Sequence, residues 1–219
     1  MASREPNFLF LFCGLVALII GVPLLQALLG RSFPAVPPVG HSVLLLAGVW
    51  TLATSPASFW LGVVLVAASI AITARALAHP SPLLSLASLG IAWSFCLLTI
   101  ALCLRHVFAR GRVTVNHLLG ATCVYLLLGA LWGLGYAALH VLRRDSFRAS
   151  DPADAIAIDD LMYFSFVTLT TTGFGDIVPV GRLVRIVVAL EGVVGQLYVA
   201  SLVATLVSQY VSPTREPPV

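Results

Sequence analysis

The sequence predicts an all-α membrane protein, and three observations carry this prediction. Of the 219 residues, 59% are hydrophobic and only 10% are charged. The mean hydropathy of +1.02 is typical of a chain whose solvent is lipid. Several apolar runs are long enough to cross roughly 30 Å of hydrocarbon as helices. Because a soluble globular domain carries about 25% charged residues, a water-soluble enzyme, a disordered chain and a fibrous repeat are excluded.

The charges and cysteines exclude further classes of protein. All basic residues are arginine and the net charge is +3, so the chain lacks the electrostatic footprint of a nucleic-acid-binding protein. Cys13, Cys96, Cys103 and Cys123 lie within apolar runs and form no CxxC pair. Cys96 and Cys103 share a helix face, which leaves a disulfide or metal site open there. Ordinary buried thiols that behave as small apolar side chains fit the pattern better.

The first half of the chain contains a series of candidate spans. Residues 8–29 lack the short core and cleavage site of a signal peptide, so we expect an uncleaved helix. Residues 57–78 and 83–104 are clear spans. The run 42–54 is short for a crossing, and three interpretations are open: a thin span, a re-entrant piece, or the start of one long helix bent at Pro56.

The second half of the chain has a more varied residue composition. Residues 115–142 form a run long enough to cross with a tilt. Residues 143–160 are aqueous, and five aspartates among them either concentrate cations or belong to a solvated loop: Asp145, Asp151, Asp154, Asp159 and Asp160. Residues 161–172 are apolar and rich in threonine but too short to span, whereas 183–210 form a last long span.

Residues 168–176 read Thr-Leu-Thr-Thr-Thr-Gly-Phe-Gly-Asp. A half-span helix that begins near Asp159 and Asp160 has its positive end complemented by these acids, and its other end presents partial negative charge at membrane depth. Non-helical backbone at this depth is tolerated only where it lines a water-filled or ion-filled cavity. Gly173 and Gly175 permit dihedrals that let successive carbonyls point the same way. Such a column of oxygens replaces the hydration shell of an ion.

The hexapeptide 171–176 resembles the selectivity filter of potassium channels, whose common form is T-V-G-Y-G-D. The block 162–179, the following Gly-Arg-Leu-Val and the last span resemble the pore helix, filter and inner helix of that family, and 115–142 its outer helix. The resemblance implies about six transmembrane helices, with a re-entrant pore helix and filter between the last two. It implies permeant K⁺ ions and four chains around them, a homotetramer. The implied ion-binding residues are Thr171, Thr172, Gly173, Phe174, Gly175 and Asp176, of which the first four hold K⁺ directly.

Three positions depart from the family pattern. Thr172 stands where the family usually has Val or Ile, and Phe174 lacks the tyrosine hydroxyl that often braces the filter. Val167 stands where some members carry a pore-helix glutamate that bonds to the filter aspartate, so Asp176 has another partner or faces water. These departures motivate an alternative function, a weakly selective monovalent cation channel of the same build.

The last span contains candidates for gating and for the cavity. Gly192, at the family's hinge position, and Gly195 are either a gating hinge or sites of close helix packing. Val193, Gln196, Ala200 and Ala204 form a small, mildly polar stripe that suits a water-filled cavity. Glu191 lies about 200° from Val193 around the helix. We therefore favour a filter buttress that contacts the pore helix over a carboxylate ring in the cavity.

The resemblance divides the chain into N-terminal transmembrane helices of unknown role (1–112), a pore domain (113–211) and a disordered tail (212–219). With six spans both ends are cytoplasmic; if 42–54 does not cross, the N-terminus is outside. Residues 83–104 contain no arginine, so we expect no strong voltage gating. We expect a multi-pass protein of a plasma membrane, bacterial by composition, with lipids as partners and no soluble regulatory domain. An intramembrane enzyme or a structural membrane subunit fits less well, because the histidines lie near span ends.

Overall fold

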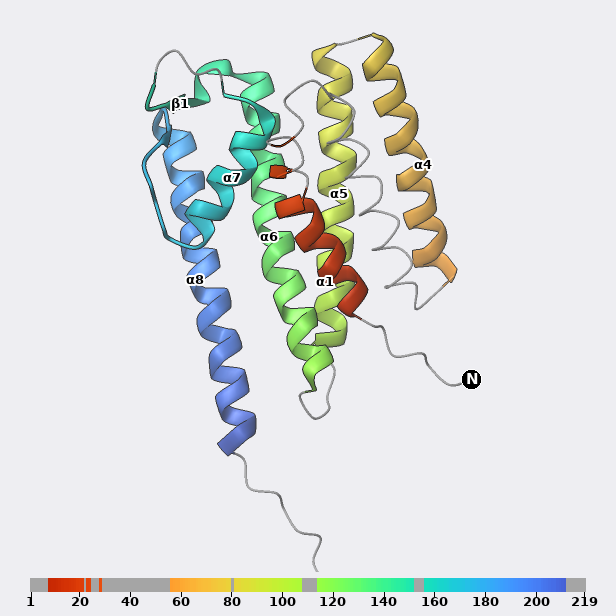
Figure 1. Cartoon of the computed structure of the whole chain (residues 1–219), viewed down its shortest axis with the longest axis vertical. Helices are drawn as coiled ribbons and strands as arrows, with labels where there is room; N and C mark the ends of the chain where they lie inside the picture. Colours follow the sequence, from red (N-terminus) through yellow and green to blue (C-terminus); the bar gives the residue numbers. More distant parts are fainter. Residues whose placement is uncertain are drawn as a thin grey trace, which may run out of the picture.

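The computed structural model describes residues 8–21, 23–24, 28, 56–79, 81–107, 114–151 and 156–211. Within these ranges the chain is almost entirely helical, and long helices stand side by side (Figure 1). The elements are α1 (Phe8–Val16), the π-helical turn η1 (Ala17–Gly21), α4 (Pro56–Ala78), α5 (Pro82–Val107), α6 (Val115–Leu142), the 3₁₀ turn η2 (Arg144–Ser146), β1 (Phe147–Ala149), α7 (Ile158–Leu169), β2 (Ile177–Pro179) and α8 (Arg182–Val211).

Three of the described helices are long and apolar enough to cross a membrane: Pro82–Val107, Val115–Leu142 and Arg182–Thr205. They support an integral membrane protein of the all-α class. The expected count of about six spans stays a prediction. The run 42–54 and the tail 212–219 lie outside the described residues.

The expected helix over residues 8–29 differs from the structure. The regular helix α1 ends at Val16, and the next five residues form a π-helical turn. Pro23 accounts for this difference, because a proline cannot donate to the carbonyl four residues earlier and its ring crowds that carbonyl. Widened turns are a common response to such an interruption in the hydrogen-bond ladder.

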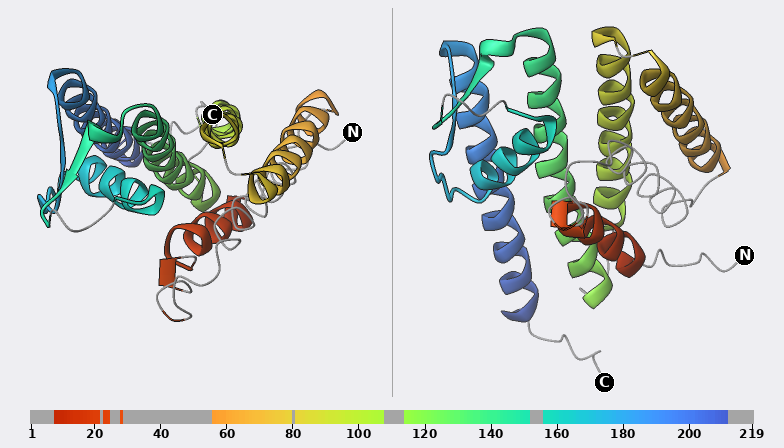
Figure 2. Two further views of the ribbon diagram at one scale, coloured as in Figure 1. Left: turned by 90° about the horizontal axis from the view of Figure 1, so that it is seen from above. Right: turned by 45° about the horizontal axis from the view of Figure 1, so that its top comes forward.

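Helix α6 forms the centre of the packed core. It packs against α1 and α5 on one side and against α7 and α8 on the other, whereas α4 packs against α5 (Figure 2). The buried side of α6 is mainly apolar, and it includes Ala121, Cys123, Val124, Leu127, Ala130, Leu134, Tyr136 and Ala137. All four cysteines are free thiols, so the disulfide interpretation of Cys96 and Cys103 is not supported. In the described part of the chain no cluster of side chains suits a metal ion.

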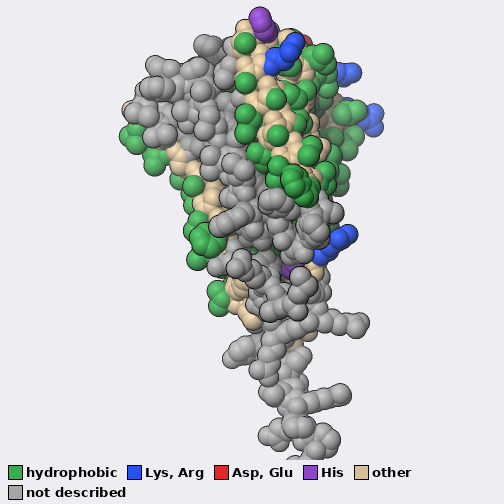
Figure 3. Space-filling view, turned by 90° about the vertical axis from the view of Figure 1, so that its right-hand side faces the viewer, with side chains coloured by type: hydrophobic (Ala, Val, Ile, Leu, Met, Phe, Trp, Pro, Cys, Tyr) green, Lys and Arg blue, Asp and Glu red, His purple; other side chains and the backbone are tan. Residues whose placement is uncertain are grey.

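The outer surface of α4 is apolar. Trp60, Leu61, Val64 and Ile70 each expose half or more of their surface. On this side of the molecule, hydrophobic side chains cover the described area, and most of the basic side chains lie toward its upper part (Figure 3). A surface of this kind suits contact with lipid chains.

A two-stranded antiparallel ribbon joins the segments on either side of α7. In its register, Phe147 pairs with Pro179, Arg148 with Val178 and Ala149 with Ile177. The Val180 amide donates to the Ser146 carbonyl at 2.8 Å and extends the ladder. The paired strands therefore hold together the two ends of the stretch of chain that contains α7 and residues 170–176.

Candidate functional site

The short helix α7 begins where the acidic residues predict it. Asp159 and Asp160 lie in its first turn, and the Asp160 carboxylate accepts a hydrogen bond from the Ala157 amide at 2.7 Å. Negative charge at this end complements the helix dipole. The opposite end, at Leu169 and Thr170, presents the partial negative charge of the last carbonyls to the segment that follows.

Helix α7 lies very close to α6 because α6 carries Gly129 and Gly133 on the facing side. A Cβ atom at Gly133 would lie 2.7 Å from the Met162 sulfur and 3.0 Å from the Met162 Cα atom. A Cβ atom at Gly129 would clash with the ring of Phe166. The spacing of the two glycines is the small-xxx-small pattern of close helix pairs in membranes. This pattern is visible in the sequence and could have predicted the contact.

The backbone of residues 171–175 alternates in the sign of φ. Thr171, Gly173 and Gly175 have φ values of +58°, +59° and +78°, whereas Thr172 and Phe174 between them do not have positive φ. Alternating right-handed and left-handed residues turn successive peptide groups to the same side. Thr171 is unusual, because a β-branched residue in the left-handed region is strained by about 1–3 kcal/mol.

Hydrogen bonds show which side of this segment faces α7. The Thr171 amide donates to the Thr168 carbonyl at 2.9 Å. The amides of Thr172 and Gly173 donate to the Val167 carbonyl at 2.9 Å and 3.3 Å. Because a trans peptide group points its C=O away from its N–H, the carbonyl oxygens of the preceding residues Thr170, Thr171 and Thr172 are turned away from α7. All six residues 171–176 are exposed on the single chain, and Phe174 exposes 69% of its surface.

The outer end of the segment has two partners that the sequence did not predict. The Ser150 hydroxyl lies 3.1 Å from the Gly175 carbonyl oxygen and 2.9 Å from that of Asp176. The Tyr163 hydroxyl lies beside the Asp176 carboxylate. Partial burial first, and then the interaction with this negative carboxylate, raise the pKa of Tyr163.

Of these two residues, Tyr163 could have been predicted from the sequence, whereas Ser150 could not. Tyr163 lies one helical turn before Val167 on the same face of α7, so helix phase could have predicted a partner for Asp176 at either position. Ser150 follows β1, and only the strand register brings it to Gly175 and Asp176. No pattern in the sequence indicates that register.

Glu191 is completely buried where α6, α7 and α8 meet. Its carboxyl oxygens lie 2.5 Å from the Ser165 hydroxyl of α7 and 2.6 Å from the Tyr136 hydroxyl of α6. The Tyr136 ring also packs edge-on against Phe147 and Phe164. The contact with α7 that helix phase favoured is therefore present in the structure.

The four residues proposed to line a cavity, Val193, Gln196, Ala200 and Ala204, are all exposed on α8. Val193 exposes 53% of its surface, whereas Glu191 exposes none, so the two side chains lie on different faces. The Gln196 amide donates to the Thr171 hydroxyl at 3.3 Å. This contact places the upper part of the stripe directly beneath the segment 171–176.

The two glycines of α8 have different surroundings. A Cβ atom at Gly195 would lie 2.5 Å from the Leu169 carbonyl oxygen and 2.9 Å from its Cδ1 atom, so this glycine permits close packing on the end of α7. At Gly192 the nearest atom to an added Cβ, the Thr168 carbonyl oxygen, would lie 3.9 Å away. Packing therefore explains Gly195 but not Gly192, for which the hinge stays a prediction.

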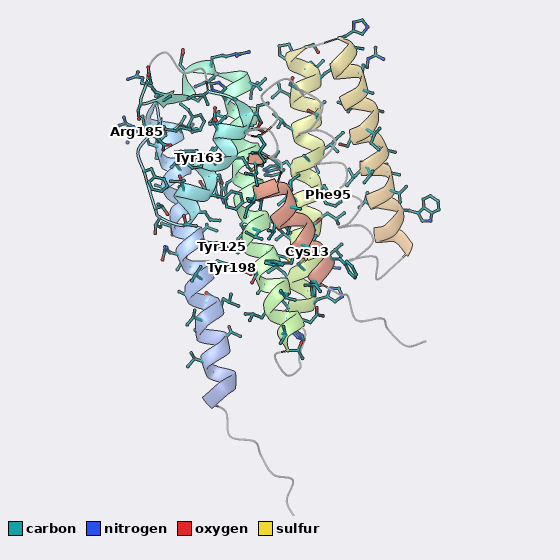
Figure 4. All side chains as sticks on the ribbon, viewed as in Figure 1. Cys13, Phe95, Tyr125, Tyr163, Arg185 and Tyr198 are labelled. Carbon is teal, nitrogen blue, oxygen red and sulfur yellow. The ribbon has the colours of Figure 1, made fainter. Side chains whose placement is uncertain are left out.

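Two stacked tyrosines connect the three helices below this point. Tyr198 of α8 donates to the Ala121 carbonyl of α6 at 2.7 Å, and Tyr125 of α6 donates to the Leu169 carbonyl at 3.2 Å. Their ring centroids are 5.9 Å apart. Figure 4 shows the pair where α6 and α8 approach each other, with Tyr163 higher on α7. Sequence reasoning missed both tyrosines, since each looks like an ordinary apolar position of its helix.

Comparison with known proteins agrees with this geometry. Residues 112–212 match a family model described as "Ion channel". Over 93 residues the chain is 30% identical to the inward rectifier potassium channel Kirbac3.1 of Paramagnetospirillum magnetotacticum. The aligned stretch covers 42% of this chain and 29% of that protein. No solved structure matches the chain. The two likenesses support a relationship to the potassium channel superfamily and an ion channel rather than an enzyme.

Proposed function

We propose that this chain is one subunit of a potassium-selective channel, in which four copies surround a pore and K⁺ crosses the membrane passively. The observation that carries the proposal is the backbone of residues 171–175. Its alternating φ values and its amide bonds to α7 leave successive carbonyl oxygens on one open face. One chain supplies only one such row, and an ion must be surrounded on all sides. A ring of four rows therefore replaces the water that the ion loses.

The neighbouring elements fit the same function. The carbonyl end of α7 points its partial negative charge at the place where a cation enters the row of oxygens. The exposed stripe that begins near Val193 suits a water-filled cavity below it, and Gln196 extends the polar lining toward Thr171. In this assignment α6 is the outer helix, α7 the pore helix and α8 the inner helix of a pore domain at 113–211. Its setting is a plasma membrane, with lipids around the assembly.

A second candidate function, a weakly selective cation channel, is favoured by the filter's own side chains. Thr172 places a hydroxyl where an apolar side chain is usual, and this hydroxyl bonds to that of Thr170 at 2.9 Å. Phe174 has no hydroxyl with which to brace the filter from behind. Reversal potentials in mixed K⁺ and Na⁺ distinguish the two functions. A shift toward the K⁺ equilibrium potential supports the first, and a reversal near zero supports the second.

The proposal is tested by K⁺ flux into liposomes that contain the purified protein, with two alanine variants. An added Cβ has open space at both Gly173 and Gly90, but Gly173 has a φ of +59° and Gly90 has no such strain. Left-handed backbone costs a non-glycine residue about 1–2 kcal/mol, and the cost recurs in each subunit. We expect Gly173→Ala to abolish flux in folded protein and Gly90→Ala to retain it. Equal flux through both variants would refute the proposal.

A further inference from the structure

We propose that Ser150 is a positioning residue for the outer end of the filter, and that residues 147–150 form a strap that holds this end in place. The inference rests on the proposed channel function and adds a residue outside the filter motif. Ser150 belongs to the linker between α6 and α7, so it acts on the ion path only through the carbonyl groups that it holds.

Ser150 binds the main chain of the filter in three contacts. Its amide donates to the Asp176 carbonyl at 2.7 Å, and its hydroxyl lies 2.9 Å from the same oxygen and 3.1 Å from the Gly175 carbonyl oxygen. The hydroxyl has a single hydrogen and donates to one acceptor at a time. Since the amide already serves Asp176, the hydroxyl is available to Gly175. Removing the hydroxyl therefore leaves the Gly175 carbonyl without its donor.

The strap is anchored at its other end. Phe147 is 5% exposed, and its ring packs edge-on against Tyr136 and Phe164 at centroid distances of 5.3 Å and 5.4 Å. The β1–β2 ladder follows directly, and the Val180 amide bonds to the Ser146 carbonyl. Ser150 thus extends from a paired strand whose first residue is fixed in the aromatic core. Its hydroxyl is consequently held in one place relative to α6 and α7.

The two ends of the filter segment are held in different ways. At the inner end, the amides of Thr171, Thr172 and Gly173 bond directly to carbonyls of α7. Among the described residues, no such main-chain bond to α7 reaches Phe174, Gly175 or Asp176. There the Asp176 carboxylate accepts a hydrogen bond from the Ile177 amide at 3.1 Å, and the Asp176 main chain bonds to Ser150. Because Val167 and Phe174 supply no polar group of their own, Ser150 is, among the described residues, the residue outside the segment that binds its outer carbonyls.

The test compares Ser150→Ala with Ser150→Thr, which keeps the hydroxyl, and with Ser94→Ala. Ser94 is a matched control, because its hydroxyl bonds to the Gly90 carbonyl at 2.8 Å on the exposed side of α5, far from the filter in sequence and element. The ratio of K⁺ to Na⁺ permeability is measured from reversal potentials in planar bilayers. We expect Ser150→Ala to lower this ratio by about three- to tenfold, the effect of one hydrogen bond. Ser150→Thr and Ser94→Ala should keep the wild-type ratio.

The outcomes separate this inference from the proposed function. Absence of K⁺ current in the wild type refutes the channel itself. A conducting wild type with an unchanged ratio in Ser150→Ala refutes the role of Ser150, as does an equal loss in Ser94→Ala. If Ser150→Ala does not assemble, Ser150→Thr decides the question: a wild-type ratio supports the hydroxyl's role, and an altered ratio overturns it.

Discussion

If the Glu191 carboxyl is charged, the hydrogen-bond network around it lacks one donor hydrogen. The Ser165 hydroxyl has one hydrogen, but two oxygens lie within reach: the Gly129 carbonyl at 2.7 Å and the Glu191 carboxyl at 2.5 Å. If the Gly129 and Glu191 oxygens were both acceptors only, one of the two short contacts of the Ser165 hydroxyl would bring two lone pairs together. A donor at the Glu191 position satisfies every atom, since Ser165 then donates to Gly129. A neutral carboxyl provides that donor, and so does an amide.

This donor count predicts opposite results for two variants of Glu191. Glu191→Gln keeps the shape and supplies the donor, so it should change the free energy of unfolding by less than about 1.5 kcal/mol. Glu191→Ala leaves the buried Tyr136 hydroxyl without its acceptor, whereas Ser165 still donates to the Gly129 carbonyl, so we expect a cost of about 1–3 kcal/mol for the unpaired hydroxyl and a further cost for the cavity. Thermal denaturation of the purified protein in detergent measures both changes. A Gln variant as unstable as the Ala variant would show that a charged carboxylate is needed.

At the scale of elements, close approach to α7 is the common theme. Gly129 and Gly133 let α7 approach α6 closely, and Gly195 lets the Leu169 carbonyl at the end of α7 approach α8 closely. Buried contacts then link the three helices through Glu191 and through the Tyr125–Tyr198 pair. We therefore expect a movement of α8 to shift the end of α7, which the segment 171–176 follows directly in the chain.

The two glycines of α8 give a prediction at this scale. Gly195→Ala places a Cβ against the Leu169 carbonyl and should destabilise the protein by about 1–3 kcal/mol through overpacking, with reduced K⁺ flux. Gly192→Ala has room for its Cβ and should leave the melting temperature unchanged or higher. If Gly192 is a hinge, its alanine variant nevertheless lowers the open probability in single-channel recordings. An open probability equal to that of the wild type would refute the hinge.

For the whole molecule, local patterns predicted the elements well but not the way they join. The run 115–142 coincides with α6, because its ends are marked by polar residues. The break in α1 was missed, although Pro23 signals it, because hydrophobic length alone was counted. Gly173 and Gly175 predicted the left-handed backbone found at these two positions, whereas the sequence did not predict the left-handed Thr171. Helix phase placed Glu191 toward α7, but the identity of its partners Ser165 and Tyr136 depends on contacts between distant segments, as does the contact of Ser150 with Gly175 and Asp176.

The distribution of charge predicts weak voltage dependence. In the helices that precede α6, Arg75 lies in the last turn of α4 and Arg105 in the last turn of α5. One charge that crosses the whole membrane field contributes about 2.3 kcal/mol per 100 mV, and steep gating needs several such charges. We therefore expect the open probability to change little as the membrane potential varies from about −100 to about +100 mV. Strongly sigmoidal activation in single-channel recordings would contradict this expectation.

The position of bound ions in the assembled protein tests most directly whether residues 171–174 line a potassium pore. Crystals grown in Rb⁺ or Tl⁺, which replace K⁺ and scatter X-rays anomalously, show such ions individually. If these residues line a potassium pore, four chains surround an axis, and anomalous density lies on that axis, level with the carbonyl oxygens of Thr171, Thr172, Gly173 and Phe174. Density elsewhere, or an assembly in which these oxygens do not face a common axis, would contradict it.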